Sequence, residues 1–241
     1  MSFNYTYSMD QWFCRTEMLI GEEALKKLKN ARVAVFGLGG VGGYVVEALA
    51  RSSIGNLDLI DNDTVAPSNI NRQLIALRET IGRKKTEVMK ERVLSINPEC
   101  KIKIYNTFFL PETKNEFDFS LYDYVVDAID TVTGKLTLIE ESKKANVPII
   151  CSMGAGNKLD PTLFRVADIY DTNTDPLARV IRGECKKRRI KKLKVVYSTE
   201  KPLTPLWKEE GKRRSTPGSI SFTPSVCGLI IASEVIKDLI K

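Results

Sequence analysis

The chain has 241 residues, a formal net charge of +7 and 43% hydrophobic residues, which allows one domain with elaborations around a sizeable core. It contains no histidine, which excludes Ser-His-Asp and Cys-His catalysis and histidine-ligated zinc. Five scattered cysteines without a C-x-x-C pair argue against disulfides and a cysteine zinc site. No apolar run approaches about 18 residues, and a secretory signal is absent, so we expect a cytoplasmic protein that does not cross a membrane.

Strand-like runs alternate with helical patterns along the first two-thirds of the chain. We expect strands at 32–36, 57–61, 101–105, 124–129 and 147–152, and helices at 41–52, 83–95 and 134–146. This alternation predicts an α/β fold with a Rossmann-like, doubly wound, mostly parallel sheet. Beyond it we expect a strand at 163–169, a helix at 177–190, a strand at 195–198, a flexible loop at 201–218 and a helix from 223.

A glycine-rich loop follows the first strand. Gly37, Gly39 and Gly42 have the G-x-G-x-x-G spacing, and Gly40 lies between them. The first glycine permits a sharp turn, the second lets a phosphate approach the backbone, and the third lets helix and strand pack closely. The helix N-terminus that follows directs free N–H groups at an anion. The loop predicts a nucleotide-binding site without identifying the nucleotide.

The chain is expected to divide at about residue 160. Residues 1–160, including a helical segment at 10–30, would form the nucleotide-binding domain. Residues 161–241 would form a C-terminal, substrate-facing lobe with a basic helix, the flexible loop and the final helix.

Polar residues near the carboxyl ends of the strands narrow the choice of nucleotide. Asp61 stands about 20 residues beyond the glycine loop, where a carboxylate accepts hydrogen bonds from ribose hydroxyls. Arg72, Lys85 and Asp130 are expected to converge on the phosphates, because the carboxyl ends of the strands face the ligand crevice. Hydride transfer needs no such cations. Phosphoryl or nucleotidyl transfer uses arginine and lysine to neutralise phosphate charge and an aspartate to hold Mg²⁺.

Together these motifs resemble those of the ubiquitin-activating-enzyme-like adenylyltransferase superfamily, which includes the activators of sulfur-carrier proteins. The matching segments are GLGGVG at 37–42, LIDNDTV at 59–65, SNINRQ at 68–73, GRKKTE at 82–87, INP at 96–98 and DAID at 127–130. The resemblance implies that ATP contacts Gly39, Asp61, Asn69, Arg72, Lys85 and Asp130. It also implies that Asp130 holds Mg²⁺ and that Arg15 reaches the ATP of the partner subunit in a homodimer.

The C-terminal half indicates a branch of that superfamily. The paired C-x-x-C motifs common among sulfur-carrier activators are absent, and segments 154–162, 175–179 and 195–200 are similar to those of tRNA threonylcarbamoyladenosine dehydratases. This resemblance implies that the threonylcarbamoyl carboxylate attacks the α-phosphate of ATP and pyrophosphate leaves. A carbamoyl nitrogen would then close a ring and expel AMP.

A strongly basic run at 186–194 carries seven cations and no acid. Such a run is often only a solvated face, but in this branch it favours contact with tRNA phosphates. The residues predicted to bind tRNA are Arg182, Lys186, Lys187, Arg188, Arg189, Lys191 and Lys192.

Three other functions stay open at this point. Cys185 adjoins the basic run, which would lower the pKa of its thiol, and related enzymes place a nucleophilic cysteine near this point. An adenylyltransferase that activates the C-terminus of a ubiquitin-like sulfur-carrier protein is therefore the main alternative, although an incidental cysteine is the plainer interpretation. The interpretation as a nicotinamide oxidoreductase is supported by the glycine loop alone. A non-catalytic tRNA-binding protein would have no use for the residues predicted to bind the phosphates. A sulfur-relay or cysteine-desulfurase partner is also possible.

Overall fold

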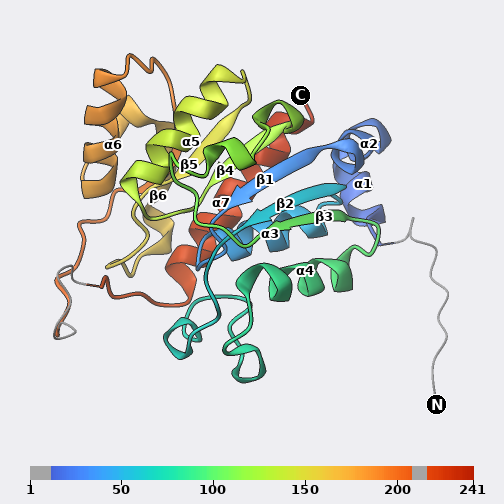
Figure 1. Cartoon of the computed structure of the whole chain (residues 1–241), viewed down its shortest axis with the longest axis horizontal. Helices are drawn as coiled ribbons and strands as arrows, with labels where there is room; N and C mark the ends of the chain where they lie inside the picture. The colour runs from blue at the N-terminus through green and yellow to red at the C-terminus, as the bar shows by residue number, and fades with distance from the viewer. Residues whose placement is uncertain (1–11, 208–215) are drawn as a thin grey trace.

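One seven-stranded sheet organises the described part of the chain, which in this computed structural model comprises residues 12–207 and 216–241. The strand order is β3-β2-β1-β4-β5-β7-β6, and every pair is parallel except β6 with β7 (Figure 1). The strands are β1 (Arg32–Phe36), β2 (Asn56–Ile60), β3 (Lys101–Tyr105), β4 (Tyr124–Asp127), β5 (Ile149–Ser152), β6 (Phe164–Asp168) and β7 (Lys194–Ser198). The predicted doubly wound, mostly parallel sheet is confirmed.

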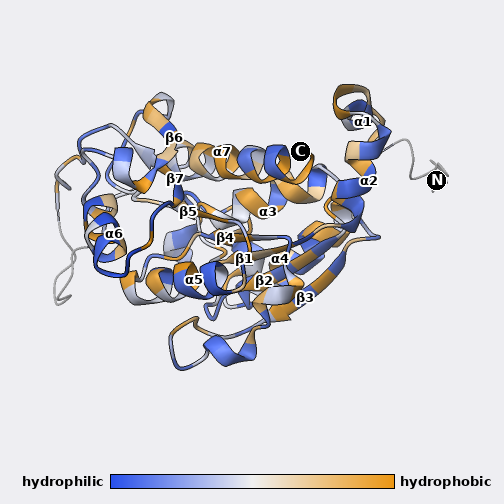
Figure 2. Ribbon diagram, turned by 90° about the horizontal axis from the view of Figure 1, so that it is seen from above, coloured by the Kyte–Doolittle hydropathy of each residue, from blue (hydrophilic) through white to orange (hydrophobic). Residues whose placement is uncertain are grey.

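Helices cover both faces of this sheet, as Figure 2 shows for α3 and α7 on one side and α5 on the other. The α-helices are α1 (Cys14–Ile20), α2 (Glu22–Asn30), α3 (Gly42–Arg51), α4 (Lys85–Ile96), α5 (Val132–Lys144), α6 (Pro176–Lys187) and α7 (Phe222–Leu239). Within residues 12–207 and 216–241, no helix is both long enough and apolar enough to cross a membrane.

The position of β1 at the centre of the sheet explains why its sequence is almost continuously apolar. Val33 and Val35 pack into the core beneath α3, α4 and α7, whereas Ala34 and Phe36 pack into the core beneath α5 and α6. Successive side chains point to opposite faces of a strand, and helices cover both faces here, so neither face has polar positions.

The order of the strands reverses beside β1. The chain proceeds from β1 outward through β2 to β3, then returns to β4 on the other side of β1. The segments that follow β1 and β4 therefore diverge and leave a crevice at the carboxyl edge of the sheet. This is the edge at which the glycine loop begins.

Residues 161–241 complete the same sheet. β7 pairs with β5, β6 pairs antiparallel with β7, and α7 packs against α3 from the first part of the chain. The expected boundary at residue 160 therefore falls between two strands of one continuous sheet.

Several predicted elements differ from the structure by two or three residues at an end, and two of these differences have a clear cause or consequence. The helix predicted at 177–190 ends at Lys187, so most of the basic run forms the turn into β7 rather than a basic helix. The strand predicted at 147–152 begins only at Ile149, after Pro148, which lacks a backbone N–H. Residues 208–215 of the predicted flexible loop lie outside the described residues.

A buried ion pair joins three elements beneath the crevice. The Lys135 ammonium on α5 donates to both carboxylate oxygens of Asp127 at the end of β4, at 3.0 and 2.9 Å, and to the carbonyl of Ser152 on β5 at 2.7 Å. Both side chains are almost fully buried. Because a buried carboxylate without its cation is costly, this pair should stabilise the start of the segment that follows β4.

We predict that Lys135→Met lowers the free energy of unfolding by about 3–5 kcal/mol, because it leaves the Asp127 carboxylate buried and unpaired. Urea unfolding followed by circular dichroism measures the change. Lys26→Met, at an exposed position on α2, is the control and should change stability by less than about 0.5 kcal/mol. An equal change in the two variants would contradict this role for the pair.

Candidate nucleotide-binding site

The glycine loop has the close contacts that its spacing predicts. Gly37 has φ +90°, and a Cβ there would lie 2.7 Å from the carbonyl oxygen of Ala128. A Cβ on Gly42 would lie 1.7 Å from the carbonyl oxygen of Gly37. By contrast, a Cβ on Gly39 would find no other heavy atom nearer than 3.9 Å. The loop is thus packed behind Gly37 and Gly42 and has free space in front of Gly39, where a phosphate can approach the backbone.

Asp61, the residue after β2, anchors this loop. One carboxylate oxygen accepts a hydrogen bond from the backbone N–H of Leu38 at 2.7 Å, and the other accepts from the N–H of Asp63 at 2.8 Å. The carboxylate therefore joins the glycine loop to the turn after β2. Its remaining lone pairs are the acceptors available to a ribose.

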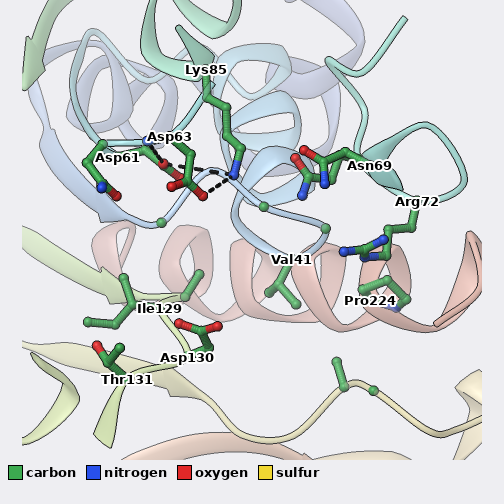
Figure 3. A pocket seen from close by; sticks show the side chains of 18 of the residues that line it. Val41, Asp61, Asp63, Asn69, Arg72, Lys85, Ile129, Asp130, Thr131 and Pro224 are labelled. Carbon is green, nitrogen blue, oxygen red and sulfur yellow. Dashed lines mark hydrogen bonds and ion pairs between the residues drawn. The ribbon is translucent and has the colours of Figure 1, made fainter. Parts of the chain in front are cut away.

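Lys85, the first residue of α4, brings a buried cation to the same place. Its ammonium lies 2.8 Å from Asp63 Oδ2 and 3.9 Å from Asp61 Oδ1. The backbone N–H of Lys85 also donates to the carbonyl of Asp63 at 3.1 Å. Main-chain and side-chain contacts together fix this cation at the edge of the crevice, as Figure 3 shows.

Arg72 supplies a second cation from the segment between β2 and α4. Its guanidinium donates to the carbonyl of Ser68 at 2.8 Å and to the side-chain oxygen of Asn71 at 2.9 Å. Both acceptors are neutral, and partial burial lowers the pKa of Arg72. Asn69 forms the turn before it, accepting from the N–H of Ala66 at 3.1 Å. The positive charge of Arg72 is thus oriented by its neighbours, and no carboxylate among the described residues neutralises it.

Asp130 lies across the crevice, in the segment between β4 and α5 (Figure 3). Its side chain is exposed and lines the cavity, and within the described residues it has no hydrogen-bond or ion-pair partner. The site therefore holds one free carboxylate opposite its cations.

These segments enclose a cavity of about 400 Å³. Eight of the predicted residues line it: Gly37, Gly39, Gly40, Asp61, Asn69, Arg72, Lys85 and Asp130. Gly42 lies behind the loop, at the start of α3. The cavity has the size of a small-molecule site and carries cations on one wall and a free carboxylate on the other, which suits a nucleotide with a bound divalent cation.

Many lining residues were not predicted as site residues, and three of them have notable side chains. Asp63 pairs with Lys85, Phe108 contributes an exposed aromatic ring, and Gln73 has a buried side-chain oxygen without a partner in the described structure. Asp63 is two residues from Asp61, and Gln73 is one residue from Arg72. This proximity in sequence to predicted site residues was the signal that could have identified them. Nothing in the local sequence marks Phe108.

Other predicted residues lie away from the cavity. Arg15 is exposed on α1, and Phe13, just before this helix, lines a hollow with Arg51 and Arg92 from the C-terminal halves of α3 and α4, away from the nucleotide cavity. The predicted tRNA-binding residues lie along α6 and in the turn after it. Arg182 is engaged inside the protein, donating to the carbonyl and hydroxyl of Thr172, both at 2.7 Å.

The expected low pKa of the Cys185 thiol is wrong. Cys185 is 0% exposed, and burial raises its pKa to about 11 despite the nearby cations. It lies on the face of α6 that packs into the core with Ala178 and Ile181. A buried, protonated thiol is inert as a nucleophile.

Comparison with known proteins agrees with this geometry. The ThiF family matches residues 13–241. The tRNA threonylcarbamoyladenosine dehydratase of Bacillus subtilis is 46% identical over 95% of this chain and 94% of its own length, and that of Haemophilus influenzae is 39% identical over 96% and 94%. The crystal structure of the Escherichia coli tRNA N6-threonylcarbamoyladenosine dehydratase in complex with ATP has a TM-score of 0.88 at 35% identity, covering 97% of this chain and 96% of that one. The chain therefore belongs to the ThiF family, within its tRNA threonylcarbamoyladenosine dehydratase branch.

Proposed function

We propose that this protein catalyses the ATP-dependent cyclisation of threonylcarbamoyladenosine in tRNA, with loss of water and release of AMP and pyrophosphate. The observation that carries the proposal is the gathering of Arg72, Lys85 and Asp130 around one cavity beside the glycine loop. Relatives that match over nearly their whole length bear this activity in their names, and one is solved with ATP.

The cavity suits nucleotidyl transfer to a carboxylate. With the ribose on Asp61 and the phosphates in front of Gly39, the cations of Arg72 and Lys85 lie where charge develops at the α-phosphate. The substrate carboxylate attacks that phosphorus, and pyrophosphate takes the electrons of the broken P–O bond. The carbamoyl nitrogen then attacks the acyl carbon, loses its proton and expels AMP.

The tethered nucleophile explains how a chain without histidine can catalyse the second step. The carbamoyl nitrogen and the activated carboxyl group belong to the same side chain of the substrate, so ring closure is intramolecular. Effective concentrations in such reactions are very high, and AMP is a good leaving group. A strong enzymic base is therefore not required.

Asp130 fits the role of a magnesium ligand. Mg²⁺ is usually held by one or two carboxylates together with substrate phosphates, and Asp130 is the exposed carboxylate that faces the cations. The described residues contain no group of three side chains that could hold a metal ion, so the proposal assigns the remaining ligands to the phosphates. When bound, the ion would neutralise phosphate charge.

A homodimer would complete the site with Arg15 of the second subunit. Arg15 is not among the residues that line the cavity of its own chain. On the same helix, Met18 and Leu19 are 85% and 86% exposed, an apolar surface that a second copy would cover. These two observations support the assembly that the resemblance implies.

The cations from Lys186 to Lys192 are proposed as tRNA contacts, in keeping with their exposure at the end of α6 and in the turn after it. Arg182 is left out of this surface because Thr172 occupies its guanidinium. A sulfur-relay or cysteine-desulfurase partner remains a prediction of the resemblance alone.

Activation of a sulfur-carrier protein is the less favoured function. That mechanism was predicted to use Cys185 as its acceptor, and the buried thiol cannot fill the role. The two bacterial relatives described above are named as dehydratases and match over nearly their whole length.

Incubation with ATP, Mg²⁺ and tRNA bearing threonylcarbamoyladenosine tests the proposal directly. We expect AMP to form in step with a nucleoside lighter by one water, measured by chromatography and mass spectrometry. AMP formation that requires a small carrier protein, with the nucleoside unchanged, would contradict it.

We predict that Arg72→Ala and Asp130→Ala each lower the rate of AMP formation by about 100-fold or more, because each removes charge stabilisation at the phosphates. The melting temperature should be unchanged, since neither side chain holds the core. Arg78→Ala and Asp171→Ala, at exposed positions outside the cavity, are the matched controls. Wild-type rates in either site variant would remove that residue from the mechanism.

We predict that a thiol-alkylating reagent labels Cys14 in the native protein and leaves Cys185 intact at neutral pH. Cys14 is partly exposed, whereas burial keeps the Cys185 thiol protonated, with a pKa of about 11, so labelling requires unfolding. Peptide mass spectrometry measures both sites, and Cys185→Ala should retain wild-type dehydratase activity. Rapid native labelling of Cys185 with loss of activity would restore it as a nucleophile.

A further inference from the structure

A second cavity, of about 530 Å³, lies between the C-terminal ends of α5 and α6. Six cations line it: Lys143, Lys144, Arg188, Arg189, Lys191 and Lys192. We call it the basic groove. Two of these residues come from α5 and the others from the turn after α6, so the groove joins segments more than forty positions apart in the sequence.

Acidic neighbours neutralise only part of this charge. Lys144 pairs with Glu141 at 2.8 Å, and Arg188 pairs with Glu140 at 2.8 Å and with Glu184. The other four cations, Lys143, Arg189, Lys191 and Lys192, have no acidic partner among the described residues. They are all exposed, so the groove carries a net excess of unpaired positive charge.

Arg189 occupies a backbone position that favours glycine. Its φ is +56°, and the N–H of Ile190 donates to the carbonyl of Cys185 at 3.0 Å, which is the hydrogen bond of a Schellman helix end. Glycine adopts this conformation at the least cost. Arg189 therefore adds a guanidinium to the groove at a position where the backbone conformation alone would favour glycine.

The groove lies at the opposite edge of the sheet from the nucleotide cavity. It precedes β5 and β7, whereas the cavity follows β1, β2 and β4. α6 spans the distance between them: Asp175, at its start, lies 3.0 Å from a Cβ built on Gly154, beside the cavity wall. A helix of this length extends about 18 Å. A ligand that reaches both places must be a macromolecule.

We propose that the basic groove binds the sugar–phosphate backbone of the substrate tRNA at a distance from the nucleotide being modified. The inference rests on the proposed function. Ile190 is the one apolar residue lining the groove, and no aromatic ring lines it among the described residues, so it offers neither a stacking platform for bases nor a pocket for the aromatic anchors typical of protein partners. Unpaired cations along a groove are suited to repeated backbone phosphates, which are bound without reading sequence.

The first test removes charge from the groove. Full-length protein carrying Lys143→Gln, Lys191→Gln and Lys192→Gln is compared with wild type for binding of threonylcarbamoyladenosine-bearing tRNA over a series of salt concentrations. We expect the affinity at low salt to fall roughly tenfold. The negative slope of log K against log salt should become shallower by about 0.7–0.9 for each phosphate that is no longer neutralised. KM for tRNA should rise while kcat stays unchanged, because the nucleotide cavity is intact.

The matched control removes the same charge elsewhere. Lys26→Gln, Lys29→Gln and Lys103→Gln, all exposed on α2 and β3, should retain the wild-type slope and KM. Equal reductions in affinity in the two triple variants would show a general charge effect and overturn the assignment of the groove.

Arg189→Gly separates binding from folding. Glycine relieves the positive φ, so the melting temperature should be unchanged or raised while tRNA affinity falls. Two results would refute tRNA binding by the groove and leave the proposed function standing. The wild-type enzyme would bind and modify tRNA, and both Arg189→Gly and the groove triple variant would keep wild-type affinity for tRNA. A wild-type protein that neither binds tRNA nor dehydrates the nucleoside would refute the proposed function itself.

Discussion

The Asp61 carboxylate is the contact on which the nucleotide cavity depends. Its two oxygens accept from the backbone of Leu38 in the glycine loop and of Asp63 in the next turn, at 2.7 and 2.8 Å, and Lys85 lies 3.9 Å away. One side chain at the end of β2 therefore sets the positions of the loop that receives the phosphates and of a cation that would neutralise them. The close packing of Gly42 against Gly37 fixes the same loop from behind.

The other wall of the cavity is built by the reversal of strand order between β1 and β4. The buried Lys135–Asp127 pair ties the end of β4 to α5 and β5, and Asp130 follows three residues later without a partner among the described residues. Its free carboxylate and the unneutralised guanidinium of Arg72 thus face each other across a preorganised cavity. Groups fixed before the substrate arrives need little reorganisation during the reaction.

Much of this site could be predicted because its residues directly follow strands. Gly37, Asp61 and Asp130 come after β1, β2 and β4 or within a few residues of them, and parallel strands bring their carboxyl ends together. The low pKa expected for Cys185 was wrong because burial of the thiol outweighs the effect of the nearby cations. The spacing of Ala178, Ile181 and Cys185 matches one face of a helix and was the signal that indicated burial.

Contacts between distant segments could not be predicted from local sequence. Lys143 lies on α5, whereas Arg189 and Lys191 lie in the turn after α6, and only the packing of α5 against α6 brings them into one groove. The engagement of Arg182 by Thr172 likewise depends on a turn ten residues earlier. Sequence could show that this region is basic, but the partners of each cation decide which charges remain available.

The central claim is that the cavity activates the substrate carboxylate by joining it to the α-phosphate of ATP. The most direct measurement uses tRNA whose threonylcarbamoyl carboxylate carries a heavy oxygen isotope at both positions, with mass spectrometry of the AMP released. The account predicts that each AMP acquires one labelled oxygen, because the water formally lost from the nucleoside leaves as a phosphate oxygen. Unlabelled AMP formed alongside cyclised nucleoside would contradict the acyl-adenylate and require a different route for that oxygen.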